Sequence, residues 1–118
     1  MSFVEFSVKG FPPAYDSGFS ITNKAHSRYP LVLRLQTRAE EAMSGKELLQ
    51  GDLAIDVKCE ARLGHRRTDA VNLLAGIANV LEKIAYTNDN QIKEIHFKQV
   101  FSEEDAYKVK IKQLTREE

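Results

Sequence analysis

The sequence is poor in cysteine and has no excess of charge of either sign. Its 17 basic residues balance 17 acidic residues, so we expect no global attraction to nucleic acid or to an anionic membrane, and any such affinity must come from local clusters. The one cysteine, Cys59, cannot form an intramolecular disulfide and lies in an alternating, strand-like stretch. We therefore expect a core thiol in a reducing cytoplasm and no zinc site.

Long apolar runs are also missing. No stretch approaches the ~18 apolar residues of a membrane span, and the N-terminus enters an alternating pattern with no apolar core of a signal peptide. We therefore expect a soluble, cytoplasmic protein. The chain has 118 residues, of which 42% are hydrophobic and 29% charged. This composition is sufficient for one core, so a single domain over residues 1–118 is expected.

Hydrophobic periodicity predicts an α+β fold with the order β-α-β-α-β-β. Alternation predicts a first strand over residues 3–9, and the loop over residues 11–29 that follows is long enough to suggest a functional role. Pro30 is typical of a first helical position, and that helix is expected to end near Ser44. Alternating apolar residues from Leu53 to Cys59 then predict a second strand with one solvated face.

The strongest helical pattern begins near Thr68 or Asp69 and continues to Ile84 or Ala85. Two further strands are expected over residues 92–101 and 106–114, and the acidic turn over residues 102–105 predicts that they form a hairpin. This order of elements indicates a mixed β-sheet with two main helices packed on one face.

Basic residues gather just before the second predicted helix. Free N–H groups and the positive end of the dipole favour an anion there, so the cluster is suited to a DNA phosphate, although a solvated surface loop explains it equally well. Asp69 is typical of a helix cap, worth about 1 kcal/mol, and Asp89 lies in an Asn-Asp-Asn turn of ordinary composition. The cluster consists of Arg62, His65, Arg66 and Arg67.

Other catalytic patterns are absent from the sequence. His26, His65 and His96 show no spacing typical of metal ligands, and His96 is expected to be structural or on the surface. No Gly-x-Ser-x-Gly elbow and no paired Cys/His signature supports a nucleophilic enzyme.

The segment from Arg66 to Ile92 resembles the RusA-type Holliday junction resolvases, small dimeric endonucleases of bacteria and their phages. The likeness consists of basic residues, Asp69, Asn72 three positions later, an amphipathic helix, and the closing stretch YTNDNQI. Weaker likeness covers the rest of the chain, including the Pro12-Pro13 pair and the last two predicted strands.

In that family, aspartates bind Mg²⁺ and a helical lysine supports cleavage of a phosphodiester. The resemblance assigns two of the aspartates to Asp69 and Asp89, but a third falls on Val71 and the lysine falls on Ala75. Asp69 and Asp89 with a DNA phosphate oxygen are sufficient for one Mg²⁺, or Mn²⁺, which keeps several waters. Asn72 is a candidate neutral ligand, and Arg66 or Arg67 is a candidate replacement for the lysine's charge.

The resemblance implies a Mg²⁺-dependent endonuclease that resolves four-way DNA junctions in recombination and repair. A homodimer is expected because two symmetric nicks need two sites. One alternative is a noncatalytic module of the same fold that binds branched DNA or a protein partner, and another is a dimeric structural protein without DNA binding. The expected DNA path consists of Lys24, His26, Arg28, Arg62, His65, Arg66 and Arg67.

Overall fold

The computed structural model describes residues 3–13, 29–62 and 70–114. One mixed sheet contains four strands in the order β1-β4-β2-β3, and the predicted α+β fold with the order β-α-β-α-β-β is confirmed, with a short 3-10 helix added before β3. The elements are β1 (Phe3–Lys9), α1 (Tyr29–Met43), β2 (Leu53–Arg62), α2 (Ala70–Leu81), η1 (Asp89–Gln91), β3 (Ile92–Ser102) and β4 (Ala106–Gln113).

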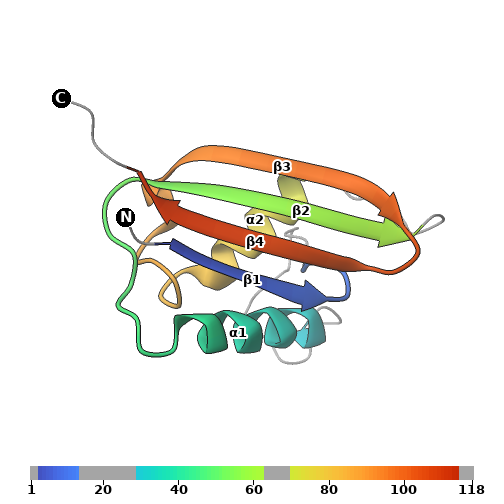
Figure 1. Ribbon diagram of the computed structural model, residues 1–118, viewed down its shortest axis with the longest axis horizontal. Helices are drawn as coiled ribbons and strands as arrows, with labels where there is room; N and C mark the ends of the chain where they lie inside the picture. Colours follow the sequence, from blue (N-terminus) through green and yellow to red (C-terminus); the bar gives the residue numbers. More distant parts are fainter. Residues whose placement is uncertain (1–2, 14–28, 63–69, 115–118) are drawn as a thin grey trace.

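Both helices cover the same face of the sheet, as predicted (Figure 1). α1 lies along β1, and α2 lies behind the central strands β2 and β4. β2 pairs in parallel with β3 and antiparallel with β4, which in turn pairs antiparallel with β1. No helix in the described part of the chain is long and apolar enough to cross a membrane.

The core lies between the helices and the inner face of the sheet. Cys59 is fully buried there, as expected, and burial raises the pKa of its thiol to about 11, with smaller contributions from Asp105 and Glu60. The thiol therefore stays protonated at neutral pH. The buried side chains of the strands include Val4, Phe6, Val8, Leu53, Ile55, Val57, Tyr107, Val109 and Ile111, and those of the helices include Val32, Leu35, Ala39, Leu73, Ile77, Val80 and Leu81.

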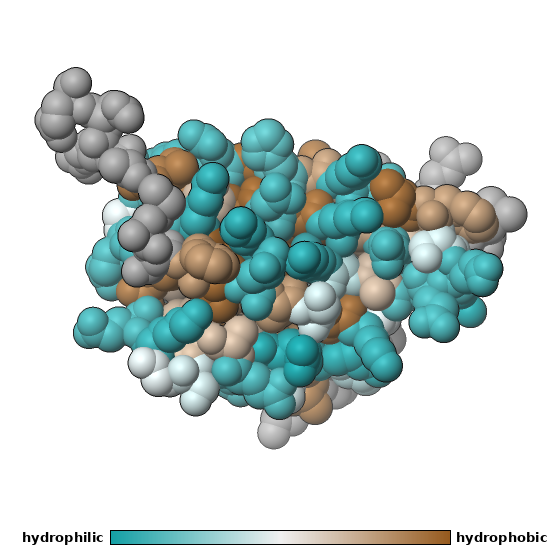
Figure 2. All heavy atoms as spheres, in the orientation of Figure 1, coloured by the Kyte–Doolittle hydropathy of each residue, from teal (hydrophilic) through white to brown (hydrophobic). Residues whose placement is uncertain are grey.

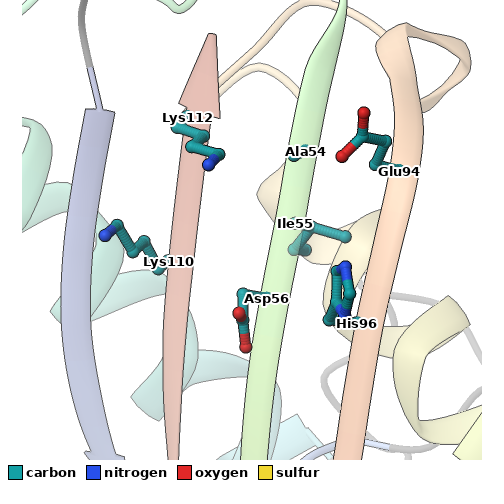
Figure 3. A pocket seen from close by; sticks show the side chains of 7 residues that line it. All are labelled: Ala54, Ile55, Asp56, Glu94, His96, Lys110 and Lys112. Carbon is teal, nitrogen blue, oxygen red and sulfur yellow. The ribbon is translucent and has the colours of Figure 1, made fainter. Parts of the chain in front are cut away.

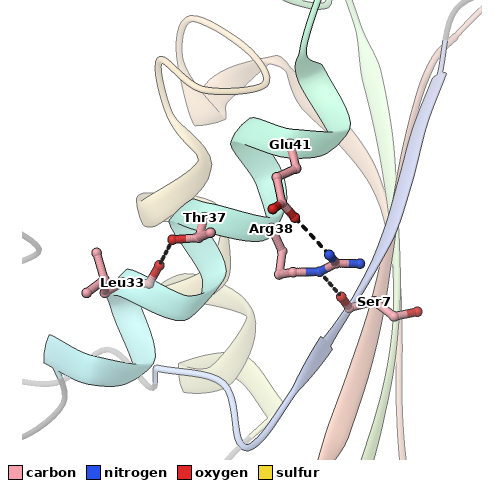
Figure 4. A network of polar contacts seen from close by, with 5 residues as sticks. All are labelled: Ser7, Leu33, Thr37, Arg38 and Glu41. Atoms are coloured by element: carbon pink, nitrogen blue, oxygen red, sulfur yellow. Dashed lines mark hydrogen bonds and ion pairs between the residues drawn. The ribbon is translucent and has the colours of Figure 1, made fainter.

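Two arginines of α1 cover the outer edge of β1. Nε of Arg38 donates a hydrogen bond of 3.0 Å to the carbonyl oxygen of Ser7, while its Nη1 contacts Oε1 of Glu41 at 2.8 Å (Figure 4). Nη1 of Arg34 donates to the carbonyl oxygen of Lys9 at 3.1 Å. Because these side chains satisfy edge carbonyls of β1, that edge is protected from pairing with another strand. β3 forms the opposite edge of the sheet.

The predicted hairpin between β3 and β4 is wrong, because β2 lies between these two strands. The segment over residues 103–105 passes across the end of β2, where Oδ1 of Asp105 accepts a hydrogen bond of 2.9 Å from the backbone N–H of Arg62. A connection of this length can span the ~9–10 Å between next-nearest strands. The short turn was therefore compatible with both arrangements, and the central position of β2 decided between them.

α2 ends at Leu81, earlier than the predicted end at Ile84 or Ala85. Lys83 has a φ of 69°, in the left-handed region that terminates a helix. The chain then turns back, and the buried hydroxyl of Tyr86 donates a hydrogen bond of 2.7 Å to the carbonyl oxygen of Ala78. This contact holds the following segment against α2 and places Asp89 beside the helix.

Candidate active site

The turn that carries Asp89 is held by the side chains on either side of it. Asn88 caps η1 by accepting a hydrogen bond of 2.8 Å from the backbone N–H of Asn90, which agrees with the predicted turn chemistry. Oε1 of Gln91 accepts from the backbone N–H of Asn88 at 3.0 Å, while its Nε2 donates to the carbonyl oxygen of Gly51 at 3.0 Å. These contacts fix Asp89 relative to the start of β2.

A hollow between α2 and the first residues of β2 and β3 contains the positions that the family resemblance singled out. Val71 and Ala75 lie one helical turn apart on α2, and both face this hollow together with Asp89. Asp89 is the one ionisable side chain among the described residues that line it, so the lining is otherwise apolar. These lining residues are Ile55, Val71, Leu74, Ala75, Ala78, Asp89, Ile92 and Ile95.

A second carboxylate, Glu82, contacts Asp89. The backbone N–H of Asp89 donates a hydrogen bond of 2.8 Å to Oε2 of Glu82. Partial burial raises the pKa of the Asp89 carboxyl, and the charge of Glu82 and a side-chain hydrogen bond with it raise that pKa further. The sequence prediction missed Glu82 because the longer predicted helix placed it inside the helix, whereas α2 ends one residue before it.

Two predicted site residues lie away from the hollow. Asn72 is half-buried on α2 and is not among the residues that line the hollow. Arg62 ends β2, seven residues and ~23 Å along the strand from Ile55. Its Nε lies 3.7 Å from Oδ2 of Asp105. The metal-binding role of Asn72 and the DNA-binding role of Arg62 therefore stay predictions.

Other predicted site residues lie outside the described part of the chain, and their roles stay predictions. The approach of Asp69 to Asp89 is one of these predictions. His96, expected to be structural or on the surface, is exposed on β3. The predicted residues outside the described ranges are Lys24, His26, Arg28, His65, Arg66, Arg67 and Asp69.

The described residues do not by themselves fit a Mg²⁺ site. Within residues 3–13, 29–62 and 70–114, no group of three or more His, Cys, Asp or Glu residues is arranged to hold a metal ion. Mg²⁺ requires oxygen ligands, whereas Val71 and Ala75 offer methyl groups at the positions that would bring charge to the hollow. A metal site here requires ligands besides Asp89, and the sequence offers Asp69 for this role.

Comparison with known proteins identifies a family whose sequence model spans the residues of this site. The family model described as Endodeoxyribonuclease RusA matches residues 21–112, more than three quarters of the chain. The matched range includes both helices, the turn with Asp89 and the strands that border the hollow. No curated protein matches the sequence.

Proposed function

Because the chain belongs to the RusA family of endodeoxyribonucleases, we propose that it is a structure-specific endonuclease that acts on four-way DNA junctions in recombination and repair. The observation that carries this proposal is the position of Asp89, which faces the same hollow as Val71 and Ala75 on α2. In the family that the chain resembles, these three positions belong to one catalytic centre. Of the three, only Asp89 is the residue type that the family has at that position.

The proposed activity depends on Mg²⁺, with Mn²⁺ as a substitute, and on Asp69 together with Asp89. Asn72 is the proposed neutral ligand. A carboxylate must lose its proton before it binds a metal ion. Because the pKa of Asp89 is raised, protons compete with the metal at this position, and the proposed activity increases as the pH rises through that pKa.

A second candidate function is a noncatalytic module that binds branched DNA or a protein partner. The apolar lining of the hollow favours this candidate. Val71 is 75% exposed, so an apolar side chain faces solvent where the family has an aspartate, and Ala75 supplies no cation to stabilise a developing negative charge. A protein that only binds junctions requires neither group.

We further propose that the chain acts as a homodimer, as a single domain over residues 1–118 and in the cytoplasm. Support for the dimer comes from β3, the edge strand that no described strand pairs on its outer side. Ile95 and Phe101 on this strand are 53% and 65% exposed. Pairing of two such edges would shield both side chains and would place two sites in one particle for two symmetric nicks.

The proposed function is tested with a labelled four-way junction and a linear duplex of the same length. Each is incubated with the protein in Mg²⁺, in Mn²⁺ and in chelator, alongside Asp69→Asn and Asp89→Asn. Asp52→Asn is a matched control, because Asp52 is an exposed turn aspartate that does not line the hollow. An endonuclease gives paired, metal-dependent nicks in the junction that both site variants abolish and the control retains.

Two other outcomes contradict this proposal. Binding to the junction without nicks in either metal identifies the noncatalytic module. Nicks that persist in Asp69→Asn or in Asp89→Asn remove the proposed role of that carboxylate.

A further inference from the structure

The face of the sheet opposite the helices, here called the open face, is rich in lysine. Figure 2 views the molecule from this side and shows hydrophilic side chains across the strands. Strand alternation places four carboxylates on the same face, namely Glu5, Asp56, Glu60 and Glu94. Cations outnumber them here although the whole chain is neutral. The lysines of the open face are Lys9, Lys58, Lys98, Lys108, Lys110 and Lys112.

Three of these lysines form a continuous row across the sheet, here called the lysine row. Lys58 of β2 is the register partner of Lys98 on β3 and also of Lys108 on β4. Like charges at directly opposite positions repel and destabilise a sheet. The fold therefore keeps three positive charges together within ~10 Å, the width of two strand spacings.

The neighbouring row has the opposite organisation. There Asp56 lies between His96 on β3 and Lys110 on β4, and Figure 3 shows the three side chains on the same side of the sheet. Lys110 in turn is the register partner of Glu5 on β1. Charges of opposite sign alternate in that row, as ordinary surface pairing predicts. The concentration of one sign in the lysine row is thus a local feature of this sheet.

The ammonium groups of the lysine row are weakly held by the protein. Lys108 contacts Glu5 at 3.3 Å and Lys58 contacts Glu60 at 4.0 Å, but all four side chains are substantially exposed. Exposed ion pairs contribute little and are screened by salt. Lys98 forms no ion pair with any described residue. A polyanion can therefore bind all three ammonium groups without breaking a strong contact.

We propose that the lysine row binds the phosphate backbone of a duplex DNA arm. Lysine is depleted at protein interfaces, which favour aromatic side chains and arginine, whereas DNA interfaces are strongly positive and polar. Lys110 and Lys112 extend the positive surface from Lys108 along β4 for ~14 Å. This inference rests on the proposed action on DNA and adds the surface that holds an arm of the substrate.

The open face is separate from the hollow with Asp89. Ile55 and Ile95 line that hollow and point to the helix side, because their register positions alternate with those of the open face. Changes to the lysine row therefore leave the residues of the hollow untouched. Binding to the arm and chemistry in the hollow can be measured independently.

The test compares two double variants that remove the same net charge. Lys58→Gln/Lys98→Gln changes the lysine row, and Lys46→Gln/Lys83→Gln changes two exposed lysines on other parts of the surface. Affinity for a linear duplex and for a four-way junction is measured in chelator from 50 to 200 mM salt. We expect the slope of log K against log salt to fall by about 2 in the row variant, about one for each lost phosphate contact, and to stay unchanged in the control.

An unchanged slope in the row variant, or an equal decrease in both variants, overturns the inference. Thermal unfolding at low salt checks the fold, and the row variant is expected to have a Tm no lower than that of the parent because repulsion is relieved. Addition of Mg²⁺ separates the inference from the proposed function. Junction nicking with an unchanged slope overturns the inference alone, a reduced slope without nicking overturns the endonuclease alone, and no binding at low salt overturns both.

Discussion

The backbone N–H of Asp89 donates a hydrogen bond of 2.8 Å to Oε2 of Glu82. Burial and the Glu82 carboxylate both raise the pKa of Asp89. We predict that Glu82→Gln lowers this pKa toward the ordinary value, because the amide keeps an acceptor oxygen but removes the negative charge. Carboxyl chemical shifts followed by NMR as a function of pH measure the effect.

The same raised pKa fixes the sign of a stability change with pH. Protonated Asp89 is favoured in the folded state, so its contribution is present below the unfolded pKa and is lost as pH rises through the folded pKa. The free energy of unfolding of the Glu82→Gln variant is therefore expected to decrease less than that of the parent as the pH rises through the folded pKa of Asp89. Glu94→Gln, an exposed carboxyl on β3, is the control. An Asp89 pKa that is the same in Glu82→Gln and in the parent contradicts this account.

Two buried tyrosines provide a matched test of what holds the turn after α2. The hydroxyl of Tyr86 donates to the carbonyl oxygen of Ala78 at 2.7 Å, whereas the buried hydroxyl of Tyr107 has no hydrogen-bond partner among the described residues. We predict that Tyr86→Phe lowers the free energy of unfolding by about 1–2 kcal/mol and that Tyr107→Phe is neutral or stabilising. Urea denaturation measures both values, and equal losses would refute the assigned role of Tyr86.

Restoring charge to the hollow tests whether the apolar residues Val71 and Ala75 on α2 limit cleavage. We predict that Val71→Asp/Ala75→Lys raises Mg²⁺-dependent junction cleavage by roughly 10²-fold or more, because it returns a ligand and a cation to positions beside Asp89. At Val71 the change is expected to cost little stability, since this residue is 75% exposed. Single-turnover cleavage of a labelled junction measures the gain.

Val71→Asn/Ala75→Gln is the control for that experiment, because it adds polar side chains of similar size without charge. An equal increase in both variants would mean that polarity, and not charge, was limiting. No increase in the charged variant would mean that the residues around the hollow no longer support the reaction.

Local chemistry was sufficient to predict the order of elements and the turn with Asp89, because alternation, helical spacing and Asn-Asp preferences act over a few residues. The pairing of β4 with β2 joins segments far apart in the sequence, and the contact between Arg62 and Asp105 at the end of β2 joins residues 43 positions apart. A three-residue turn carries no information about which strand lies beside it. The position of Glu82 likewise depends on the left-handed conformation of Lys83 and on the buried contact of Tyr86, which helical periodicity does not reveal.

The outer edge of β3 is the proposed dimer interface. Phe101 is 65% exposed on this strand and does not line the hollow, whereas Arg34 and Arg38 cover the edge of β1 at the other side of the sheet. We predict that Phe101→Glu weakens the proposed dimer at least tenfold, because a charge is then buried in an apolar contact. Sedimentation equilibrium measures the dissociation constant.

Leu33→Glu is the matched control, since Leu33 is 49% exposed on α1 and lies away from β3. It is expected to leave the dissociation constant unchanged. Because paired nicks need two sites in one particle, Phe101→Glu should also convert paired nicks into single, uncoupled nicks at protein concentrations below the new dissociation constant. A dimer that tolerates Phe101→Glu but not Leu33→Glu would move the interface from β3 to α1.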